Sequence, residues 1–171
     1  MRVAPDPADP THGRLIWPGG QAGCRLGRSG VIPAAGKREG DGATPAGAWP
    51  LRRLYYRADR LAAPATALDV TALDPAWCWI DDPADARYNR LVPGPVDGSH
   101  ERLWRDDRRY DLIVPLGYND DPPVAGLGSA IFLHLTDDPP GPTAGCVAVD
   151  RGTLTTLLAV VGPASRLIIA G

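Results

Sequence analysis

Apolar residues in the first third of the chain form short runs interrupted by glycine and proline, a pattern typical of strands and turns. The runs GRLIW (13–17) and QAGCRLG (21–27) flank a Pro-Gly-Gly turn and together predict a hairpin. A long glycine-rich loop over residues 28–47 follows. The leucines of AWPLRRLYYR (48–57) do not alternate cleanly with polar residues, so this run predicts a strand with a bulge or bend.

The last third of the chain adds apolar runs that predict four strands and one helix. The predicted strands are YDLIVPLGYN (110–119), SAIFLHL (129–135), CVAV (146–149) and SRLIIA (165–170). Pro115 interrupts the first of these and is expected to mark an edge or a bulge. Apolar residues recur at helical spacing in RGTLTTLLAVVG (151–162), directly after Asp150, which is a favourable N-cap.

This order of elements predicts a mainly β fold, a β-sandwich-like mixed sheet with one packed helix near the C-terminus. We expect residues 1–12 to be an extended N-terminal segment and residues 13–171 to form one domain with an irregular insertion at about 58–109. A short helix is expected to begin within residues 99–111. The insertion is either a cap over a cleft or a segment that packs against the domain without a role in binding. Its residues of interest are Trp77, Trp79, Tyr88, His100 and Trp104.

Composition narrows the classes of partner. The 171 residues carry a net charge of −2 with no basic face, so nucleic acid is not an expected partner. Glycine and proline make up about a quarter of the chain, yet they punctuate apolar runs, which favours a loop-rich β protein over disorder. No transmembrane segment and no secretory signal are expected from the hydropathy pattern.

The stretch FLHLTDDPPGPTAGCV (132–147) is the first candidate for chemistry, because it places His134 and Cys146 twelve positions apart. A thiol attacks only as thiolate, so it needs a nearby base and backbone N–H groups directed at the developing oxyanion. The amides of Ala144, Gly145 and Cys146 are candidate oxyanion donors, and the Thr143 hydroxyl is suited to fixing the turn. Spacing alone favours the alternative, a buried structural histidine and a buried structural cysteine.

Other polar clusters give weaker hypotheses. Three cysteines, Cys24, Cys78 and Cys146, and three histidines lack the spacing of metal ligands, so no metal site is expected. A disulfide between Cys24 and Cys78 stays open. The aspartate pairs at 120–121 and 137–138 are expected to be solvated at the mouths of loops rather than to act as acid and base.

Two motifs together resemble a known family. His134, a variable loop and Thr143-Ala144-Gly145-Cys146 are similar to the active-site motif of the YkuD-type L,D-transpeptidases, which carry Ser/Thr-x-Gly-Cys after a histidine. The upstream stretch KREGDGATPAGAWPL (37–51) resembles the Gly-x-x-Thr-Pro-x-Gly segment of the same family. The two motifs occur in the family's order and span about residues 14–170, which implies a catalytic domain of the L,D-transpeptidase type.

This resemblance implies an activity. Cys146 attacks the carbonyl of an L-centre of a peptidoglycan stem peptide, the D-residue beyond it leaves, and an amine resolves the thioester. His134 acts as the base, and no cofactor is required. The family's site of action implies the periplasm or cell envelope, and carbapenem-type inhibitors are expected to acylate Cys146. A carboxypeptidase or amidase that passes the same acyl-enzyme to water, and a non-catalytic peptidoglycan-binding domain, are the alternatives.

The chain departs from the family pattern near the cysteine. Many members have histidine where this chain has Ala144, and arginine where it has Ala148. A substrate-positioning charge is therefore expected from elsewhere, with Arg87, Arg102 and Arg105 as the candidates. The expected substrate-binding residues are Arg105, Trp104, Tyr118 and Asn119.

The loop TDDPPGP (136–142) is short and proline-rich and is expected to narrow the approach to Cys146. Together with GYNDDPPVAGLGSAIFLH (117–134), it resembles a proteobacterial subclass. Members of that subclass link L-alanine at stem position 1 to diaminopimelate at position 3, which gives 1,3 crosslinks.

Overall fold

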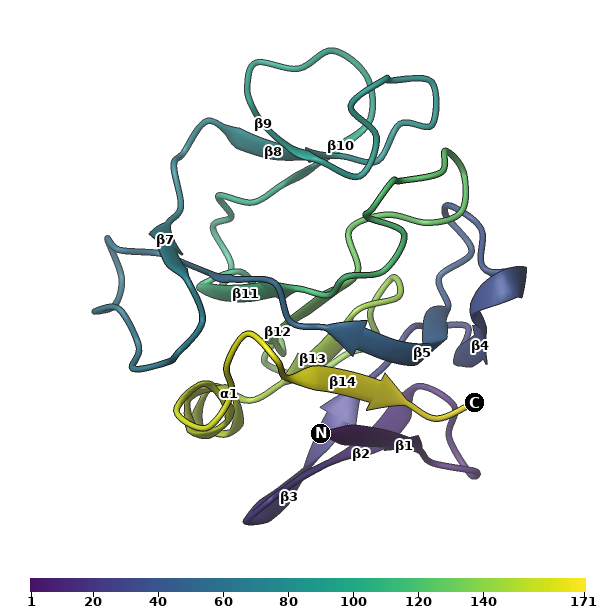
Figure 1. Cartoon of the computed structure of the whole chain (residues 1–171), viewed down its shortest axis with the longest axis vertical. Helices are drawn as coiled ribbons and strands as arrows, with labels where there is room; N and C mark the ends of the chain where they lie inside the picture. The colour runs from purple at the N-terminus through teal and green to yellow at the C-terminus, as the bar shows by residue number, and fades with distance from the viewer.

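The computed structural model describes residues 1–171, and Figure 1 shows their arrangement. The strands are β1 (Arg2–Pro5), β2 (His12–Trp17), β3 (Gly20–Arg25), β4 (Val31–Pro33), β5 (Thr44–Pro50), β6 (Leu54–Tyr56), β7 (Val70–Ala72), β8 (Trp77–Ile80), β9 (Leu91–Pro93), β10 (His100–Arg102), β11 (Leu112–Pro115), β12 (Phe132–Leu135), β13 (Val147–Val149) and β14 (Arg166–Ile169). A 3₁₀ turn (Ala34–Gly36) follows β4, and the α-helix α1 spans Arg151–Leu158. No helix is long and apolar enough to cross a membrane.

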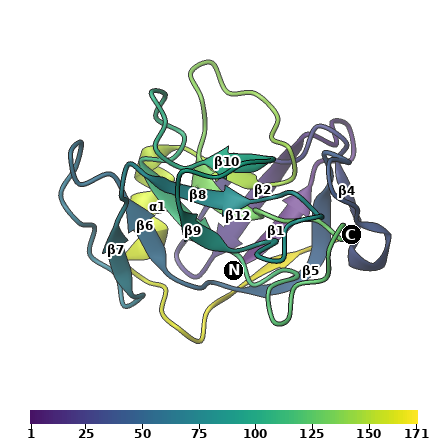
Figure 2. The same cartoon turned by 90° about the horizontal axis from the view of Figure 1, so that it is seen from above.

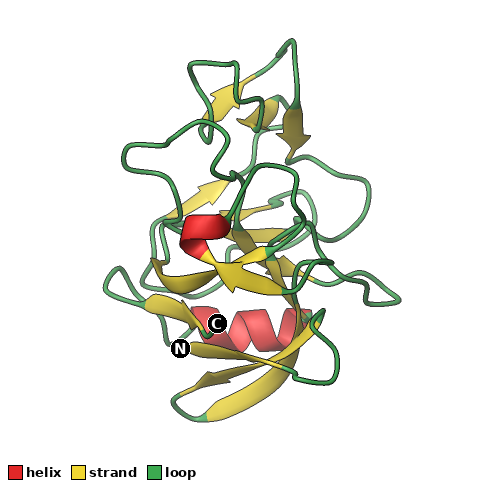
Figure 3. Cartoon of the chain, turned by 90° about the vertical axis from the view of Figure 1, so that its right-hand side faces the viewer, coloured by secondary structure: helices red, strands yellow, loops and turns green.

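Eleven strands form one mixed sheet in the order β4-β5-β14-β1-β2-β3-β13-β12-β11-β6-β7. The sheet curls around α1, whose buried face packs against strands from both halves of the sheet (Figure 3). Asp150 caps the helix, since its carboxylate accepts the N–H of Thr153. The predicted mainly β fold with one helix near the C-terminus is therefore confirmed, as is the hairpin of β2 and β3.

The N-terminal segment is part of this sheet. β1 is extended as expected, but it pairs in parallel with β14 and antiparallel with β2, so residues 1–12 do not lie outside the domain. Hydrophobic alternation could not indicate this, because Val3 is the only fully buried side chain of the strand. Pro115 is the last residue of β11, an inner strand, and so does not mark a sheet edge.

The insertion at about 58–109 is more regular than expected. β7 extends the large sheet, and β8, β9 and β10 form a separate three-stranded sheet. Residues 100–102 form β10, which pairs with β8, so the helix expected within residues 99–111 is wrong. The small sheet lies over one face of the large sheet (Figures 1 and 2), where the ring of Trp79 meets that of Phe132 edge-on at 5.0 Å.

The packing between the two sheets forms a second, smaller core. Its buried residues are Tyr55, Leu73, Leu103, Tyr110, Ile113, Phe132 and Cys146, and four tryptophan or leucine side chains of the insertion pack against them. β12 is buried on both faces because Leu133 and Leu135 belong to the α1 core, whereas Phe132 faces the small sheet. The insertion thus covers the face of the large sheet on which Cys146 lies.

Candidate active site

Strands β12 and β13 place His134 and Cys146 on the same face of the large sheet. They pair in parallel, with Leu133 opposite Val147 and His134 opposite Ala148. Side chains alternate between the faces of a strand, so Leu133 and Val147 point to the α1 core, and His134 and Ala148 point to the opposite face. Cys146 lies two residues before Ala148 and therefore shares its face with His134.

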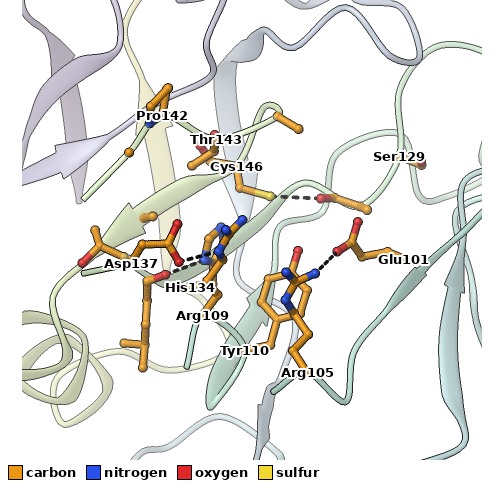
Figure 4. Close-up of a pocket in the computed structure, with 16 residues that line it drawn as sticks. Glu101, Arg105, Arg109, Tyr110, Ser129, His134, Asp137, Pro142, Thr143 and Cys146 are labelled. Atoms are coloured by element: carbon orange, nitrogen blue, oxygen red, sulfur yellow. Dashed lines mark hydrogen bonds and ion pairs between the residues drawn. The ribbon is translucent and has the colours of Figure 1, made fainter. Parts of the chain in front are cut away.

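A pocket of about 280 Å³ opens above this face (Figure 4). Its lining includes the predicted residues His134, Thr143, Ala144 and Cys146, and the predicted substrate-binding residue Arg105. Sequence reasoning missed Glu101, Arg109, Tyr110, Ser129 and Asp137, which also line it. Glu101, Arg105 and Arg109 belong to the insertion, which supports its interpretation as a cap over a cleft.

The thiol of Cys146 is buried and neutral in this structure. Its Sγ donates to the carbonyl of Ala130 at 3.2 Å (Figure 4). The same Sγ accepts the N–H of Phe132 at 3.3 Å. Burial raises the pKa of Cys146 to about 12, although the Phe132 N–H acts in the opposite direction. The thiolate needed for attack must therefore be formed when a substrate is present, by transfer of the proton to a base.

His134 is suited to take that proton through one particular nitrogen. Nδ1 lies 2.8 Å from the carbonyl of Leu135, which can only accept, so Nδ1 carries the hydrogen and Nε2 is the basic nitrogen. Burial lowers the pKa of His134 to about 4, with a smaller contribution from Arg109. The imidazole is consequently neutral throughout the neutral pH range, with Nε2 available as an acceptor.

This lowered pKa predicts an acid-sensitive stability. The unfolded chain binds a proton on His134 below its ordinary pKa of 6.5, whereas the folded chain binds it only below about 4. The free energy of unfolding should therefore fall by about 3 kcal/mol as the pH drops from 6.5 to 4. Urea unfolding at half-unit pH steps measures this slope. His134→Gln should remove that component of the slope, and an unchanged slope in this variant would contradict the assignment.

The turn before Cys146 is fixed by Thr143. Its Oγ1 donates to the carbonyl of Cys146 at 2.7 Å and accepts the N–H of Gly145 at 3.1 Å. The amides of Ala144 and Cys146 have no protein acceptor, so these two N–H groups are free to bind an oxyanion. The expectation that Gly145 supplies a third donor is wrong for this structure, because its N–H is already bound to Thr143.

The upstream motif at residues 37–51 is linked to the same turn by hydrogen bonds, although it lies about a hundred residues earlier in the sequence. Thr44, fully buried at the start of β5, accepts the N–H of Gly27 through Oγ1 at 2.8 Å. The next residue, Arg28, donates its N–H to the carbonyl of Thr143 at 2.8 Å, and the Thr143 N–H binds the carbonyl of Leu26 at 2.8 Å. The two motifs that resemble the family are thus joined by hydrogen bonds through residues 26–28.

Three of the four expected substrate-binding residues lie outside the pocket. Trp104 packs under the guanidinium of Arg57 at 3.7 Å, and Tyr118 is buried with its hydroxyl donating to the Leu127 carbonyl. The side chain of Asn119 binds the carbonyls of Val124 and Gly128 and so shapes its own loop. These three residues have structural roles here, and only Arg105 lines the pocket.

The remaining expectations from sequence have mixed outcomes. Arg87, Arg102 and His100 do not line the pocket, and Arg87 pairs with Asp85. Asp137 is partly exposed at the pocket edge, where it also forms an ion pair with Arg109. The three cysteines are free, so Cys24 and Cys78 are not paired in this structure.

Comparison with known proteins agrees with the motif resemblance. A family model described as the L,D-transpeptidase catalytic domain (YkuD) matches residues 9–169. No curated protein and no solved structure matches the chain.

Proposed function

The chain belongs to the L,D-transpeptidase catalytic-domain family, which acts on peptidoglycan stem peptides, and from this we propose that it crosslinks stem peptides through a thioester on Cys146. The single observation that carries the proposal is the pocket in which Cys146, the His134 imidazole and two unpartnered amides meet. Members of this family typically act in the cell envelope, and we place this protein's action there.

Acylation follows from these roles. Sγ attacks the carbonyl carbon of an L-centre while Nε2 of His134 takes the thiol proton. The carbonyl oxygen becomes an oxyanion, which the N–H groups of Ala144 and Cys146 stabilise. The C–N bond then breaks, and the imidazolium gives its proton to the departing amine. The products are a thioester on Cys146 and a free D-residue amine.

The thioester is resolved by a second stem peptide. Its amine attacks the thioester carbonyl and gives a proton to Nε2 of His134, the C–S bond breaks, and the proton returns to Sγ. Because the thiol and the imidazole are both neutral before substrate binds, the ion pair exists only during these steps. The site requires no metal or organic cofactor for this sequence.

We further propose that the donor is L-alanine at stem position 1, which gives 1,3 crosslinks. The support is the short proline-rich loop over residues 136–142, whose Gly141 and Pro142 form a wall of the pocket beside Cys146. Proline fixes φ near −65°, so three prolines within this loop leave that wall little freedom to open, which favours a donor residue with a small side chain such as L-alanine.

Incubation of the protein with disaccharide-peptide monomers, followed by mass spectrometry, tests this proposal. We expect crosslinked dimers whose fragmentation locates an L-alanine to diaminopimelate bond, and no dimers with Cys146→Ala. Dimers joined between two diaminopimelates would refute the donor assignment but not the crosslinking. Trimmed monomers without dimers would identify a hydrolase instead. Unchanged monomers would indicate the non-catalytic binding domain.

A further inference from the structure

Two arginines reach the pocket from the segment between β10 and β11, and they differ in how many of their terminal nitrogens have a protein partner. Arg105 binds Asp107 through Nε and Nη2 and Glu101 through Nη1. Arg109 binds Asp137 through Nε, which also lies 3.6 Å from Oδ2 of Asp107, and neither of its Nη atoms has a protein partner. The outer edge of the Arg109 guanidinium therefore presents two unused N–H donors at the pocket (Figure 4).

The backbone of Arg109 is anchored next to His134. Its carbonyl accepts the N–H of Leu135, the residue after His134, at 3.0 Å, and its own N–H binds Oδ1 of Asp107 at 3.1 Å. The neighbouring residue, Tyr110, places its ring edge-on to the His134 imidazole with centroids 5.2 Å apart. Main-chain and side-chain contacts therefore hold Arg109 close to His134.

Charged residues outside the pocket fix the backbone of the segment that carries Arg105 and Arg109. Arg57 donates to the carbonyl of Arg105 at 2.6 Å, and Arg60 donates to the carbonyl of Asp107 at 2.7 Å. Asp111 is buried and pairs with Arg60 at 2.7 Å, which keeps that guanidinium in place. These contacts predict a segment whose geometry is set before a ligand binds, which favours specific recognition.

The chemistry of the free donors points to a carboxylate. Two N–H groups on one edge of a guanidinium match the two oxygens of a carboxylate and form short charge-assisted hydrogen bonds. The opposite wall cannot supply this contact, since β13 contributes only the buried methyl group of Ala148. Arg109 is thus the cation of the pocket whose two terminal nitrogens both lack a protein partner.

Stem peptides carry a carboxylate at the required place. When a D-residue leaves from an L-centre, the carbon that bears the leaving nitrogen also bears an α-carboxylate. This holds for terminal D-alanine, and also for D-glutamate, because the stem continues through the γ-carboxyl of that residue. The leaving nitrogen must lie near His134, which protonates it, and so its α-carboxylate falls on the side where Arg109 stands.

We propose that Nη1 and Nη2 of Arg109 bind the α-carboxylate of the D-residue that leaves, and so select the donor peptide. This proposal rests on the proposed function, because it assumes that stem peptides occupy the pocket. Arg109 is accordingly a specificity-determining residue, and Asp137 is the positioning residue that orients it.

Calorimetric titration of Cys146→Ala protein with stem tetrapeptides tests the contact without turnover. The peptides are the free acid, the amide of the D-glutamate α-carboxyl and the amide of the terminal D-alanine. We expect Arg109→Met to weaken binding of the free acid by about tenfold or more. One of the two amides should bind the parent protein, which keeps Arg109, as weakly as the free acid binds Arg109→Met. Arg109→Met should not weaken the binding of that amide any further. The amide that behaves in this way identifies the recognised carboxylate.

Arg108→Met is the matched control, since Arg108 is the exposed neighbour outside the pocket, and it should bind all three peptides like the parent. Arg109→Lys keeps the charge and should restore part of the affinity. Equal losses for the acid and both amides in Arg109→Met, or no binding of the free acid by the parent, would overturn the inference. Acylation of wild-type Cys146 by a carbapenem, read by intact mass, tests the proposed function separately.

Discussion

His134→Gln is expected to slow acylation of Cys146 by a carbapenem by about a hundredfold to ten-thousandfold at pH 7, the range typical of a lost general base. With the pKa of Cys146 near 12, only about one thiol in 10⁵ is ionised at pH 7. Nearly all attack must therefore use the proton transfer to His134. Intact-mass kinetics with a carbapenem in excess measure the rate.

The pH profile separates a lost base from a distorted site. In the wild type, Nε2 of His134 is free above its pKa of about 4, so the rate should be nearly constant from pH 6 to 9. In His134→Gln, the rate should rise about tenfold per pH unit, following the thiolate population. His100→Gln, a change of the same type outside the pocket, should retain the wild-type rate and profile. A flat profile in His134→Gln would refute the assignment of the base.

Gly145→Ala is expected to destabilise the protein and to remove most of its activity. Gly145 has φ +138°, and a Cβ at this position would lie 2.8 Å from the carbonyl oxygen of Ala43. Backbone strain and the forced shift together predict a loss of about 2–5 kcal/mol in the free energy of unfolding. For a domain of this size, Tm should fall by about 5–15 °C.

The same substitution should displace the amides on either side of Gly145, and with them the oxyanion site. Acylation should therefore decrease even at temperatures where Gly145→Ala is fully folded. Gly23→Ala in β3 is the control, because an added Cβ there meets no atom within 4 Å. Thermal melts and carbapenem acylation of both variants give the comparison. Wild-type stability of Gly145→Ala would show that the Ala43 contact does not constrain the turn.

Local patterns predicted the hairpin of β2 and β3, the strands β11 to β14 and the motif residues, because these depend on neighbours in sequence. Apolar runs indicated β12 and β13, and the register of the two strands then brings His134 and Cys146 to one face. The helix was predicted because Leu154, Leu157 and Leu158 follow helical spacing and are indeed buried. Only the assignment of His134 as the base and Cys146 as the nucleophile needed the second motif, which lies at residues 37–51.

The missed features depend on pairings between distant segments. β1 is an inner strand only because β14, at the other end of the chain, lies beside it. Arg109 lines the pocket because its backbone binds β12, which no local pattern indicates. Tyr118 and Asn119 lie near aspartates and a glycine, as ligand-binding residues often do, but their polar groups are used by their own loop.

The position of β1 between β14 and β2 has a consequence for the time course of folding. β14 joins β1 to β5, so the large sheet cannot close until strands from opposite ends of the domain have paired. Thr44, which supports the turn at Cys146, lies at the start of β5 and depends on that closure. The pocket is therefore expected to form late in folding, in a step dominated by contacts of high sequence separation.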